Sequence, residues 1–438
     1  MIKYFKSKAD FFLRYNWLFK KMLSEASKNL EEDYSVLSQR QNDRFIQLVH
    51  YAVKRSRFYR SLYAKHGVDL QTIKSIDDLH KLPVIKKEDI RDQVDEVRIG
   101  SRFFKTKGYT SGTSGSPLVV YRDYRCVLEE GAYIWAQRNR AGYQPGMKTV
   151  SMRGDLARKE LYRYDASSNT LYLSSYNLSE KNARLFLDKI AEFAPYALLA
   201  YPSSADILAT FANSMNKDVH IPYIFTSSET LYDFQREKFE QVFGSNVQDW
   251  YGNAERTIAL MQNQKDGYDE LPLYSVNEYQ SGSTITTGLI NKSFPLIRYQ
   301  IGDIIIPEKY RVSYQEKITI KKINGRDDDV LHLPDGTQVG RLDVIFKGIK
   351  NIDFAQFEQS NQESFVLNIV PNPSFSQKDE KELINNLKAR VGGDASYVVN
   401  RVSKKDIKLS KSGKYKLVFN YISNNQPLQR EKTSSSIY

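Results

Sequence analysis

Hydroxyl groups and glycines are concentrated in one short segment of the chain, residues 109–117, with the sequence Tyr-Thr-Ser-Gly-Thr-Ser-Gly-Ser-Pro. Glycine adopts positive φ at no steric cost, so the backbone N–H groups of this segment can converge on an anion. The spacing is not that of a Walker loop. This composition is typical either of a phosphate-binding loop or of an exposed turn. The residues available for phosphate binding are Thr110, Ser111, Gly112, Thr113, Ser114 and Gly115.

Two motifs in the middle of the chain place carboxylates beside aromatic or glycine residues. Residues 251–255 are Tyr-Gly-Asn-Ala-Glu, in which the Tyr251 ring is suited to stacking on a base and the Glu255 carboxylate to holding Mg²⁺ beside phosphates. Residues 295–303 end in Gly-Asp, where the Asp303 carboxylate is placed to accept the two hydroxyls of a ribose. Each motif alone is equally typical of an ordinary turn.

Two further motifs lie toward the C-terminus. Residues 324–329, Asn-Gly-Arg-Asp-Asp-Asp, gather a guanidinium and three acids. Residues 409–414, Leu-Ser-Lys-Ser-Gly-Lys, place Lys414 directly after a glycine turn. The first motif is also typical of a solvated hinge, and the second of an exposed hairpin.

Short apolar runs alternate with longer amphipathic segments from residue 170 onward, as strands alternate with helices. Because this alternation builds a sheet flanked by helices, we predict an α/β fold. Ligands of such sheets bind beyond the carboxyl ends of the strands, and polar residues follow three predicted strands, at 201–203, 226–229 and 251–253. The predicted strands are residues 171–173, 196–201, 223–225 and 247–250, and the predicted helices are 40–63, 179–193, 203–215 and 231–243.

The sequence changes in character after Arg326, where extended runs surround a charged helical segment at 378–391. Further strands are predicted at 365–370, 397–401 and 415–421, so a small α+β domain is expected there. We predict a large domain over residues 1–326, which starts with a basic, aromatic, helical segment at 1–34, and a small C-terminal domain over 327–422. The polar tail at 423–438 is expected to be disordered.

Composition narrows the class of protein. The 438 residues have 41% apolar content and no apolar run long enough to cross a bilayer, and nothing marks the chain for export, so we expect a cytoplasmic protein. One cysteine and five scattered histidines cannot form a disulfide or a zinc site. The net charge of +12 favours anionic partners, but no nucleic-acid-binding motif is present. The N-terminal segment is suited either to a membrane surface or to packing on its own domain.

Taken in order, these motifs resemble the adenylate-forming superfamily of acyl-CoA synthetases and adenylation domains, over roughly residues 37–422. The likeness is greatest to the phenylacetate-CoA ligase branch and its capsular-polysaccharide relatives of the CapK type. This likeness to the branch is carried by residues 82–83, 86–91, 201–203, 325–329, 333–336 and 346–347. The resemblance implies a large domain of helix-flanked sheets with a small, mobile α+β C-terminal domain. It also implies ATP and Mg²⁺ as cofactors and a carboxylic acid that is adenylated, with release of pyrophosphate, before transfer to a nucleophile.

The resemblance also implies a role for each motif residue. The hydroxyls and glycines from Thr110 to Gly115 would hold the β- and γ-phosphates, and the base and metal would be bound by residues near 251. Electrostatic stabilisation of charge developing at the α-phosphorus would drive the reaction. The implied roles are adenine binding for Tyr251, Gly252, Ser227, Ser228 and Glu229, Mg²⁺ binding for Glu255, ribose binding for Asp303 and Arg326, a hinge at Asp328, and catalysis by Lys414 together with Glu255.

The sequence departs from the family pattern at several positions, and one of these departures concerns the acceptor of the acyl group. Gln300 and Ile301 stand where Arg-Thr is common, and Ser275 stands where many phenylacetate-type ligases have histidine. Residues 332–339 do not resemble the glycine-containing loop used for thioester formation, so coenzyme A is a weaker expectation than an amine or hydroxyl acceptor.

Three functions remain open on this basis. The first is an adenylating ligase that passes its acyl group to an amine or hydroxyl, on a sugar or a carrier, in capsular or O-antigen polysaccharide biosynthesis. The second is a phenylacetate-type acyl-CoA ligase. The third is a catalytically inactive nucleotide-binding scaffold, in peripheral contact with a membrane through its N-terminus.

Overall fold

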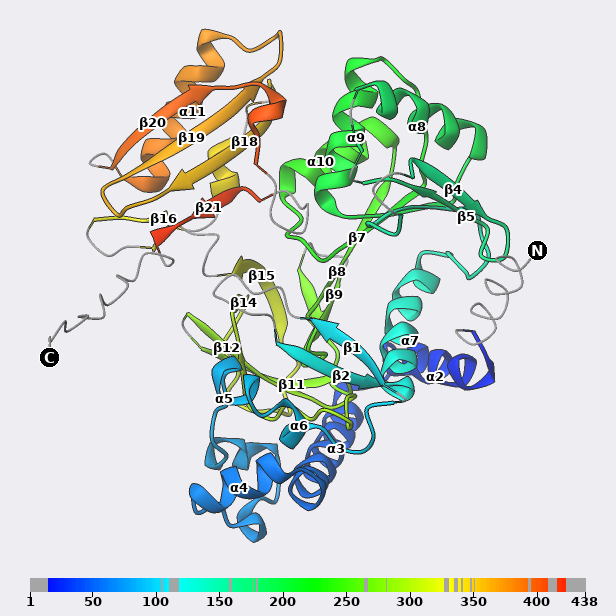
Figure 1. Ribbon diagram of the computed structural model, residues 1–438, viewed down its shortest axis with the longest axis vertical. Coiled ribbons are helices and arrows are strands. Elements are labelled where there is room, and N and C mark those ends of the chain that lie inside the picture. Colours follow the sequence, from blue (N-terminus) through cyan, green and yellow to red (C-terminus); the bar gives the residue numbers. More distant parts are fainter. Residues whose placement is uncertain are drawn as a thin grey trace, which may run out of the picture. The chain divides into compact units, whose positions relative to one another are not determined.

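The chain forms two units, each with its own β-sheet (Figure 1). Among the described residues, unit 1 ends at Gly325 and unit 2 begins at Arg326. The computed structural model describes residues 15–103, 105–109, 118–156, 160–175, 177–178, 180–263, 267–280, 282–326, 331–334, 338–339, 342–346, 349, 351–392, 395–408 and 416–422.

Unit 1 starts with helices. Their bounds are α2 (Trp17–Asn29), α3 (Tyr34–Arg55), α4 (Arg57–Lys65), η1 (Leu70–Thr72), η2 (Ile76–Lys81), α5 (Lys87–Arg91) and α6 (Val94–Val97). The prediction of one helix over 40–63 was wrong, because Ser56 is extended at φ −97° and ψ 130° and separates α3 from α4. The Ser56 hydroxyl donates to the Glu96 carbonyl at 2.8 Å, and Ser56 is the N-cap of α4.

The main sheet of unit 1 has ten strands in the order β14-β15-β10-β9-β8-β7-β6-β3-β5-β4. The five central strands, β8, β7, β6, β3 and β5, are parallel to one another. On either side of them, the pairs β8–β9 and β5–β4 are antiparallel. The bounds are β3 (Thr149–Met152), β4 (Tyr162–Asp165), β5 (Thr170–Leu173), β6 (Ala197–Ala200), β7 (Tyr223–Ser227), β8 (Asn246–Gly252), β9 (Ala259–Gln262), β10 (Tyr268–Glu270), β14 (Asp303–Pro307) and β15 (Thr319–Arg326).

Helices cover both faces of this sheet. On one face α8 (Glu180–Phe193), α9 (Pro202–Ser214) and α10 (Asp233–Phe243) bury their apolar sides against Leu198, Ile224 and Val247. On the other face α7 (Tyr124–Arg140) packs against Leu199, Phe225 and Trp250. The strand–helix alternation predicted between residues 170 and 250 is confirmed, and so is the α/β class.

Two smaller sheets complete unit 1. The hairpin β1 (Lys105–Tyr109) and β2 (Val119–Asp123) pairs Tyr109 with Val119. The second sheet contains β11 (Ser275–Gln280), β12 (Ser283–Gly288) and β13 (Tyr299–Ile301) in that order.

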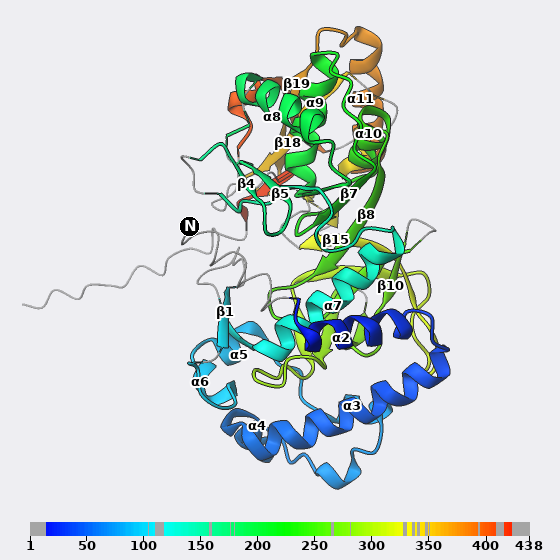
Figure 2. The same cartoon turned by 90° about the vertical axis from the view of Figure 1, so that its right-hand side faces the viewer.

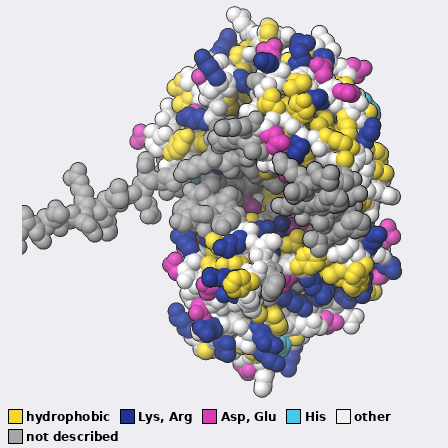
Figure 3. Space-filling model, turned by 45° about the vertical axis from the view of Figure 1, so that its right-hand side comes forward, with side chains coloured by type: hydrophobic (Ala, Val, Ile, Leu, Met, Phe, Trp, Pro, Cys, Tyr) yellow, Lys and Arg dark blue, Asp and Glu magenta, His cyan; other side chains and the backbone are white. Residues whose placement is uncertain are grey.

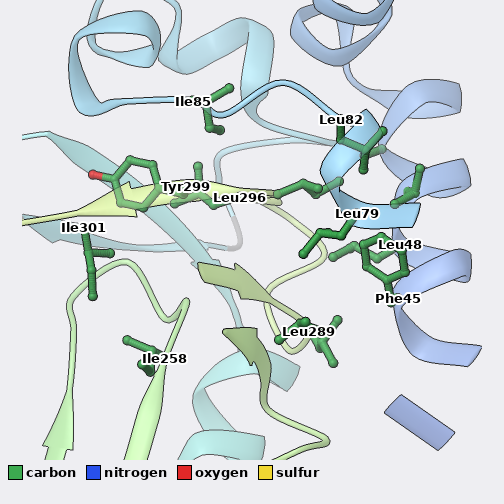
Figure 4. Packing of buried hydrophobic residues seen from close by; sticks show 14 of the residues in the cluster. Phe45, Leu48, Leu79, Leu82, Ile85, Ile258, Leu289, Leu296, Tyr299 and Ile301 are labelled. Atoms are coloured by element: carbon green, nitrogen blue, oxygen red, sulfur yellow. The ribbon is translucent and has the colours of Figure 1, made fainter. Parts of the chain in front are cut away.

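A buried cluster joins the N-terminal helices to the segments around β13 (Figure 4). Phe45 and Leu48 of α3 pack in the same cluster as Leu79 of η2, and Leu296 and Tyr299 come from the segment that runs into β13. Removing this much apolar surface from water stabilises the fold by roughly 1.5–3 kcal/mol per buried side chain. The cluster therefore anchors β13 and the residues that follow it.

Helix α2 packs on α7, and the two lie side by side in both ribbon views (Figures 1 and 2). Phe19, Met22 and Ala26 are buried there. The structure therefore shows intramolecular packing for the described part of the N-terminal segment. Among the described residues, no helix has both the length and the apolar character that a membrane span requires.

Unit 2 contains a four-stranded sheet in the order β20-β19-β18-β21 and one long helix. Its strand and helix predictions at 365–370, 378–391 and 397–401 are confirmed, whereas the last strand is shorter than predicted. The bounds are β16 (Leu331–His332), β17 (Gln338–Val339), η4 (Leu342–Phe346), β18 (Ile352–Gln359), β19 (Ser364–Pro371), α11 (Gln377–Val391), β20 (Ser396–Arg401), η5 (Lys404–Asp406) and β21 (Val418–Asn420).

Candidate active site

The ends of two neighbouring strands bring predicted site residues to one edge of the main sheet. Ser227 is the last residue of β7, and it lies opposite Trp250 in the parallel pairing with β8. Ser228 and Tyr251 therefore follow adjacent strand positions at the carboxyl edge, where ligands bind in sheets of this kind. Ser228 has φ +71°, an uncommon conformation for a residue with a side chain, and such strain is concentrated at functional sites.

Tyr251 and Asp303 are joined by a hydrogen bond. The Tyr251 hydroxyl donates to Asp303 Oδ2 at 2.6 Å, although 52 residues separate them. Burial and the neighbouring Asp303 carboxylate hold the pKa of Tyr251 well above its usual value, so the phenol stays protonated and acts as the donor. A carboxylate accepts several hydrogen bonds on its two oxygens, so this contact orients Asp303 without exhausting its acceptor capacity.

Glu255 contacts a tyrosine that was not among the predicted site residues. The Tyr299 hydroxyl donates to Glu255 Oε1 at 3.3 Å. Tyr299 belongs to β13, and its ring lies in the buried cluster of Figure 4 with 2% exposure. The rigid core thus places a hydroxyl donor beside the carboxylate that we expect to bind a cation.

Glu229, which follows β7 in the sequence, contacts the first turn of α9 with its side chain. Its Oε2 accepts from the backbone N–H of Ser203 at 3.0 Å, next to Pro202 at the first position of that helix. A carboxylate at a helix N-terminus is favoured because the first N–H groups lack intrahelical partners. Two of the three polar segments predicted at strand ends, 201–203 and 226–229, are therefore in direct contact.

The loop that carries Glu255 is fastened on both sides of that residue. The Arg122 guanidinium donates to the Ala254 carbonyl, from Nε at 3.1 Å and also from Nη2. Arg256, at φ +61°, forms an ion pair with buried Glu130 of α7. Sequence reasoning missed Arg122 because no local pattern links it to a carbonyl 132 residues away.

A glycine in β1 makes room for Arg122. A Cβ atom on Gly108 would lie 2.0 Å from Arg122 Nη2, and real Cβ atoms do not approach other atoms so closely. The β1–β2 hairpin flanks the predicted phosphate-binding segment, because Tyr109 and Val119 are its last paired residues. Arg122 therefore connects this hairpin to the loop bearing Glu255.

Several predicted site residues lie outside the described residues, and their predictions stand as made. Arg326 is the last residue of β15, but its side chain is not among those described. The residues concerned are Thr110, Ser111, Gly112, Thr113, Ser114, Gly115, Asp328 and Lys414.

The described residues fit a magnesium ion only in combination with substrate oxygens. Among them, no group of three or more His, Cys, Asp or Glu side chains could hold a metal ion by itself. Mg²⁺ is commonly bound by one or two carboxylates together with phosphates and water, and the Glu255 carboxylate matches that requirement.

Comparison with known proteins identifies relatives of the whole chain. Residues 331–421 match the family model of the CapK C-terminal domain. The chain is 27% identical over 404 residues to protein CapK of Staphylococcus aureus, covering 87% of this chain and 89% of CapK. It is 25% identical over 325 residues to a phenylacetate-coenzyme A ligase of Thermus thermophilus, covering 66% and 70% respectively.

A solved structure shares the fold. The 2-hydroxyisobutyryl-CoA ligase, in its postadenylation state with 2-HIB-AMP, superposes with a TM-score of 0.69 at 18% identity, over 86% of this chain and 88% of that one. The fold is that of the adenylate-forming ligases, and the sequence matches include members of the same class. Within that superfamily the chain is similar, along most of its length, to the branch that contains CapK and the phenylacetate-CoA ligases.

Proposed function

We propose that the protein adenylates a carboxylic acid with ATP and passes the acyl group to an amine or hydroxyl acceptor. The observation that carries this proposal is the 2.6 Å hydrogen bond between Tyr251 and Asp303, which joins the ring that we expect to stack on the base to the carboxylate that we expect to bind the ribose. The role in surface polysaccharide biosynthesis rests on the sequence resemblance to the capsular-polysaccharide relatives of the CapK type, and the chain is similar to protein CapK along most of both chains.

In the adenylation step a carboxylate oxygen attacks the α-phosphorus of ATP, a P–O bond forms, and pyrophosphate leaves with the displaced bond pair. Tyr251 would stack on adenine, Asp303 and Arg326 would accept and orient the ribose, and Ser228 would line the base. Lys414 would neutralise charge on the reacting oxygens, an electrostatic contribution usually worth several kcal/mol. Magnesium held by Glu255 would supply charge neutralisation at the phosphates.

In the transfer step the acceptor attacks the acyl carbon, AMP leaves, and the acceptor loses one proton to solvent. An amine would give an amide and a hydroxyl an ester. Coenzyme A is the alternative acceptor, favoured by similarity to the phenylacetate-coenzyme A ligase of Thermus thermophilus. Both functions share the adenylation step and differ only in the nucleophile.

Pyrophosphate exchange tests the shared step. Labelled pyrophosphate should enter ATP only when a suitable acid is present, and a panel of amino acids, aryl acids, fatty acids and uronic acids would find that acid. If well-folded protein catalyses no exchange with any of them, the proposal is wrong. Release of AMP that depends on added coenzyme A would select the ligase alternative, whereas release with amines or sugars would select the first.

A further inference from the structure

Arg138, on α7, is a buried cation without an acidic partner. Its exposure is 8%, equal to that of Arg298, yet Arg298 forms an ion pair with Glu278 at 2.7 Å. Arg311 and Arg256, also largely enclosed, are paired with Glu270 and Glu130. Within the described part of the chain, no ion pair or side-chain hydrogen bond involves the Arg138 guanidinium. Enclosing a cation without a counter-charge costs several kcal/mol.

Aromatic rings surround this guanidinium. Its central carbon lies 4.9 Å from the Trp135 ring centre, 5.8 Å from that of Phe225 and 5.9 Å from that of Tyr143. Cation–π contacts are worth about 0.5–2 kcal/mol each, but they leave the five N–H donors of the guanidinium plane unused. The rings therefore orient the guanidinium without satisfying its hydrogen-bond donors.

A second arginine adds to the positive charge. Burial, and after it the nearby charge of Arg153, lower the pKa of Arg138 to about 10. The guanidinium thus remains charged at neutral pH. Asp155, the acidic residue next along the chain from Arg153, accepts from the Ser151 hydroxyl at 2.6 Å and forms no ion pair with either arginine in the described structure.

The guanidinium also reaches solvent. Arg138 keeps 8% of its exposure, and none of its side-chain nitrogens is fully buried, although no hydrogen-bond partner contacts them among the described residues. Since they are unpaired but not sealed off, water can reach them.

The two arginines lie on the sheet face that leads to the candidate active site. Phe225 precedes Ser227 by two residues on β7, so both point to the face covered by α7. Arg153 directly follows Met152, the last residue of β3, at the carboxyl edge of the same parallel strands. Trp250 packs in one cluster with Trp135 and Phe225, whereas Tyr251, the next residue, packs against the buried cluster of Figure 4.

We propose that Arg138 and Arg153 form an anion subsite for the acyl substrate, which would therefore carry a second anionic group besides the carboxylate that reacts. A diacid is the simplest member of this class, because a carboxylate fits a guanidinium with two parallel hydrogen bonds. The inference rests on the proposed function and specifies its substrate class.

The reacting carboxylate is a poor occupant of the subsite. It loses its negative charge when the acyl phosphate bond forms, so a guanidinium bound to it would stabilise the ground state more than the transition state. A group that stays anionic throughout the reaction keeps the same contact in both states. Such a contact improves affinity without opposing the chemical step.

Pyrophosphate exchange with matched acids tests the subsite. Hexanoate would be compared with adipate, phenylacetate with 4-carboxyphenylacetate, and benzoate with terephthalate, each pair differing by one carboxylate. We expect the wild type to prefer the diacid in kcat/KM by about 10- to 100-fold, the range measured for a buried charge-assisted hydrogen bond. Arg138→Met should abolish that preference, and Arg138→Lys should retain part of it.

Arg125→Met is the matched control, because Arg125 lies on the same helix with 72% side-chain exposure. The control should keep the diacid preference. A preference that is equal in wild type and Arg138→Met would overturn the subsite while leaving adenylation intact.

A binding measurement keeps the inference testable whatever happens to turnover. Calorimetric titration of the full chain with adipate and terephthalate, without ATP, should show binding that weakens about tenfold in Arg138→Lys and in Arg153→Met. Diacids that bind the wild type no better than their monoacids would refute the subsite. Loss of exchange with every acid, together with intact diacid binding, would instead refute the proposed function.

Discussion

The hydroxyl of Tyr251 is a fixed donor at every physiological pH, because burial and Asp303 keep the pKa of the phenol well above its usual value. Asp303 therefore has one oxygen oriented by the protein before any ligand arrives. Preorganisation of this kind lowers the entropic cost of binding. The benefit should appear in nucleotide affinity and not in the chemical step.

Tyr251→Phe tests this division. The variant keeps the ring and loses the donor, so KM for ATP should rise about fivefold, near the 1 kcal/mol expected for one hydrogen bond, with kcat little changed. Steady-state pyrophosphate exchange as a function of ATP measures both constants. Tyr162→Phe, at an exposed position of β4, is the control, and a fall in kcat with unchanged KM would contradict the expectation.

Glu255→Gln tests the metal-binding role. The amide can still accept from Tyr299, but it lacks the negative charge that holds a divalent cation. We expect exchange to fall about 100-fold or more and the magnesium concentration for half-maximal rate to rise, as for loss of a metal-ion contribution of several kcal/mol. Glu237→Gln, at an exposed position of α10, should behave as wild type. If Glu255→Gln needed the same magnesium concentration for half-maximal rate as the wild type, Glu255 would not be a metal ligand.

Among elements, the β1–β2 hairpin is tied to the Glu255 loop by Arg122, whose guanidinium lies where a side chain on Gly108 would be. Two different substitutions should break the same connection. Gly108→Ala should displace the guanidinium, and Arg122→Gln should remove it.

Each single variant should slow exchange about tenfold, and the double variant should be no slower than either, because residues that act as a unit are not additive. The double-variant cycle is measured from the exchange rates of these three variants. Lys107→Gln, at an exposed position of β1, is the control. Additive losses in the double variant would mean that the glycine and the arginine act separately.

A buried carboxyl group joins three strands of the main sheet. Asp249 of β8 accepts from Thr226 of β7 at 2.6 Å and from Tyr268 of β10 at 2.7 Å. Burial raises the pKa of Asp249 despite these hydrogen bonds. Protonation is thus easier in the folded chain than in the unfolded one, whose aspartate pKa is about 3.9.

The raised pKa of Asp249 makes the stability of the folded chain depend on pH. As pH rises above about 3.9, the unfolded chain loses this proton before the folded chain does, so the wild type loses stability until pH exceeds the raised pKa. Asp249→Asn cannot titrate. Chemical denaturation from about pH 4 to about pH 8 should show the wild type losing stability relative to the variant, and a constant difference would refute the shift.

The sequence predicted the alternating strands and helices between residues 170 and 250 well, because central parallel strands appear as short apolar runs and their helices keep a 3.6-residue period. The interruption at Ser56 was missed, since it depends on the carbonyl of Glu96, which is distant in the sequence. For the same reason Tyr299 and Arg122 were not predicted as neighbours of the Glu255 loop. The hydrogen bond between Tyr251 and Asp303 was not predicted, because the resemblance implied only that each residue binds the nucleotide.

At the scale of the whole molecule, the candidate residues are divided along the chain between the two units. Tyr251, Glu255 and Asp303 belong to unit 1, whereas Lys414 lies beyond Arg326, where unit 2 begins. Binding and catalysis should therefore be separable by truncation.

A chain ending at Arg326 should bind ATP within about tenfold of the full-length affinity and lose exchange about 1,000-fold, as expected when a transition-state charge partner is removed. Calorimetry measures the first quantity and pyrophosphate exchange the second. Full-length Lys414→Ala should show the same separation. Exchange by the truncated chain would place the catalytic cation elsewhere.

Lys and Arg side chains gather at the lower end of the molecule in Figure 3, the region where Figure 1 places α3 and α4. A surface pocket of about 510 Å³ lies there, lined by Arg55, Arg57, Arg98 and Arg102 together with Asp95, Glu96 and Gly100. This concentration of charge accounts for part of the net +12 and should make the association of the protein with polyanions sensitive to salt.

Cys126, the single cysteine of the chain, lies on α7 and is fully buried in the core, and burial holds the pKa of its thiol far above the usual range. Because only the thiolate reacts readily, maleimide dyes should leave the native protein unlabelled. A cysteine engineered into each unit would then accept a fluorophore at a chosen point without deleting the natural one. Energy transfer between two such dyes would report whether the distance between the units changes during turnover.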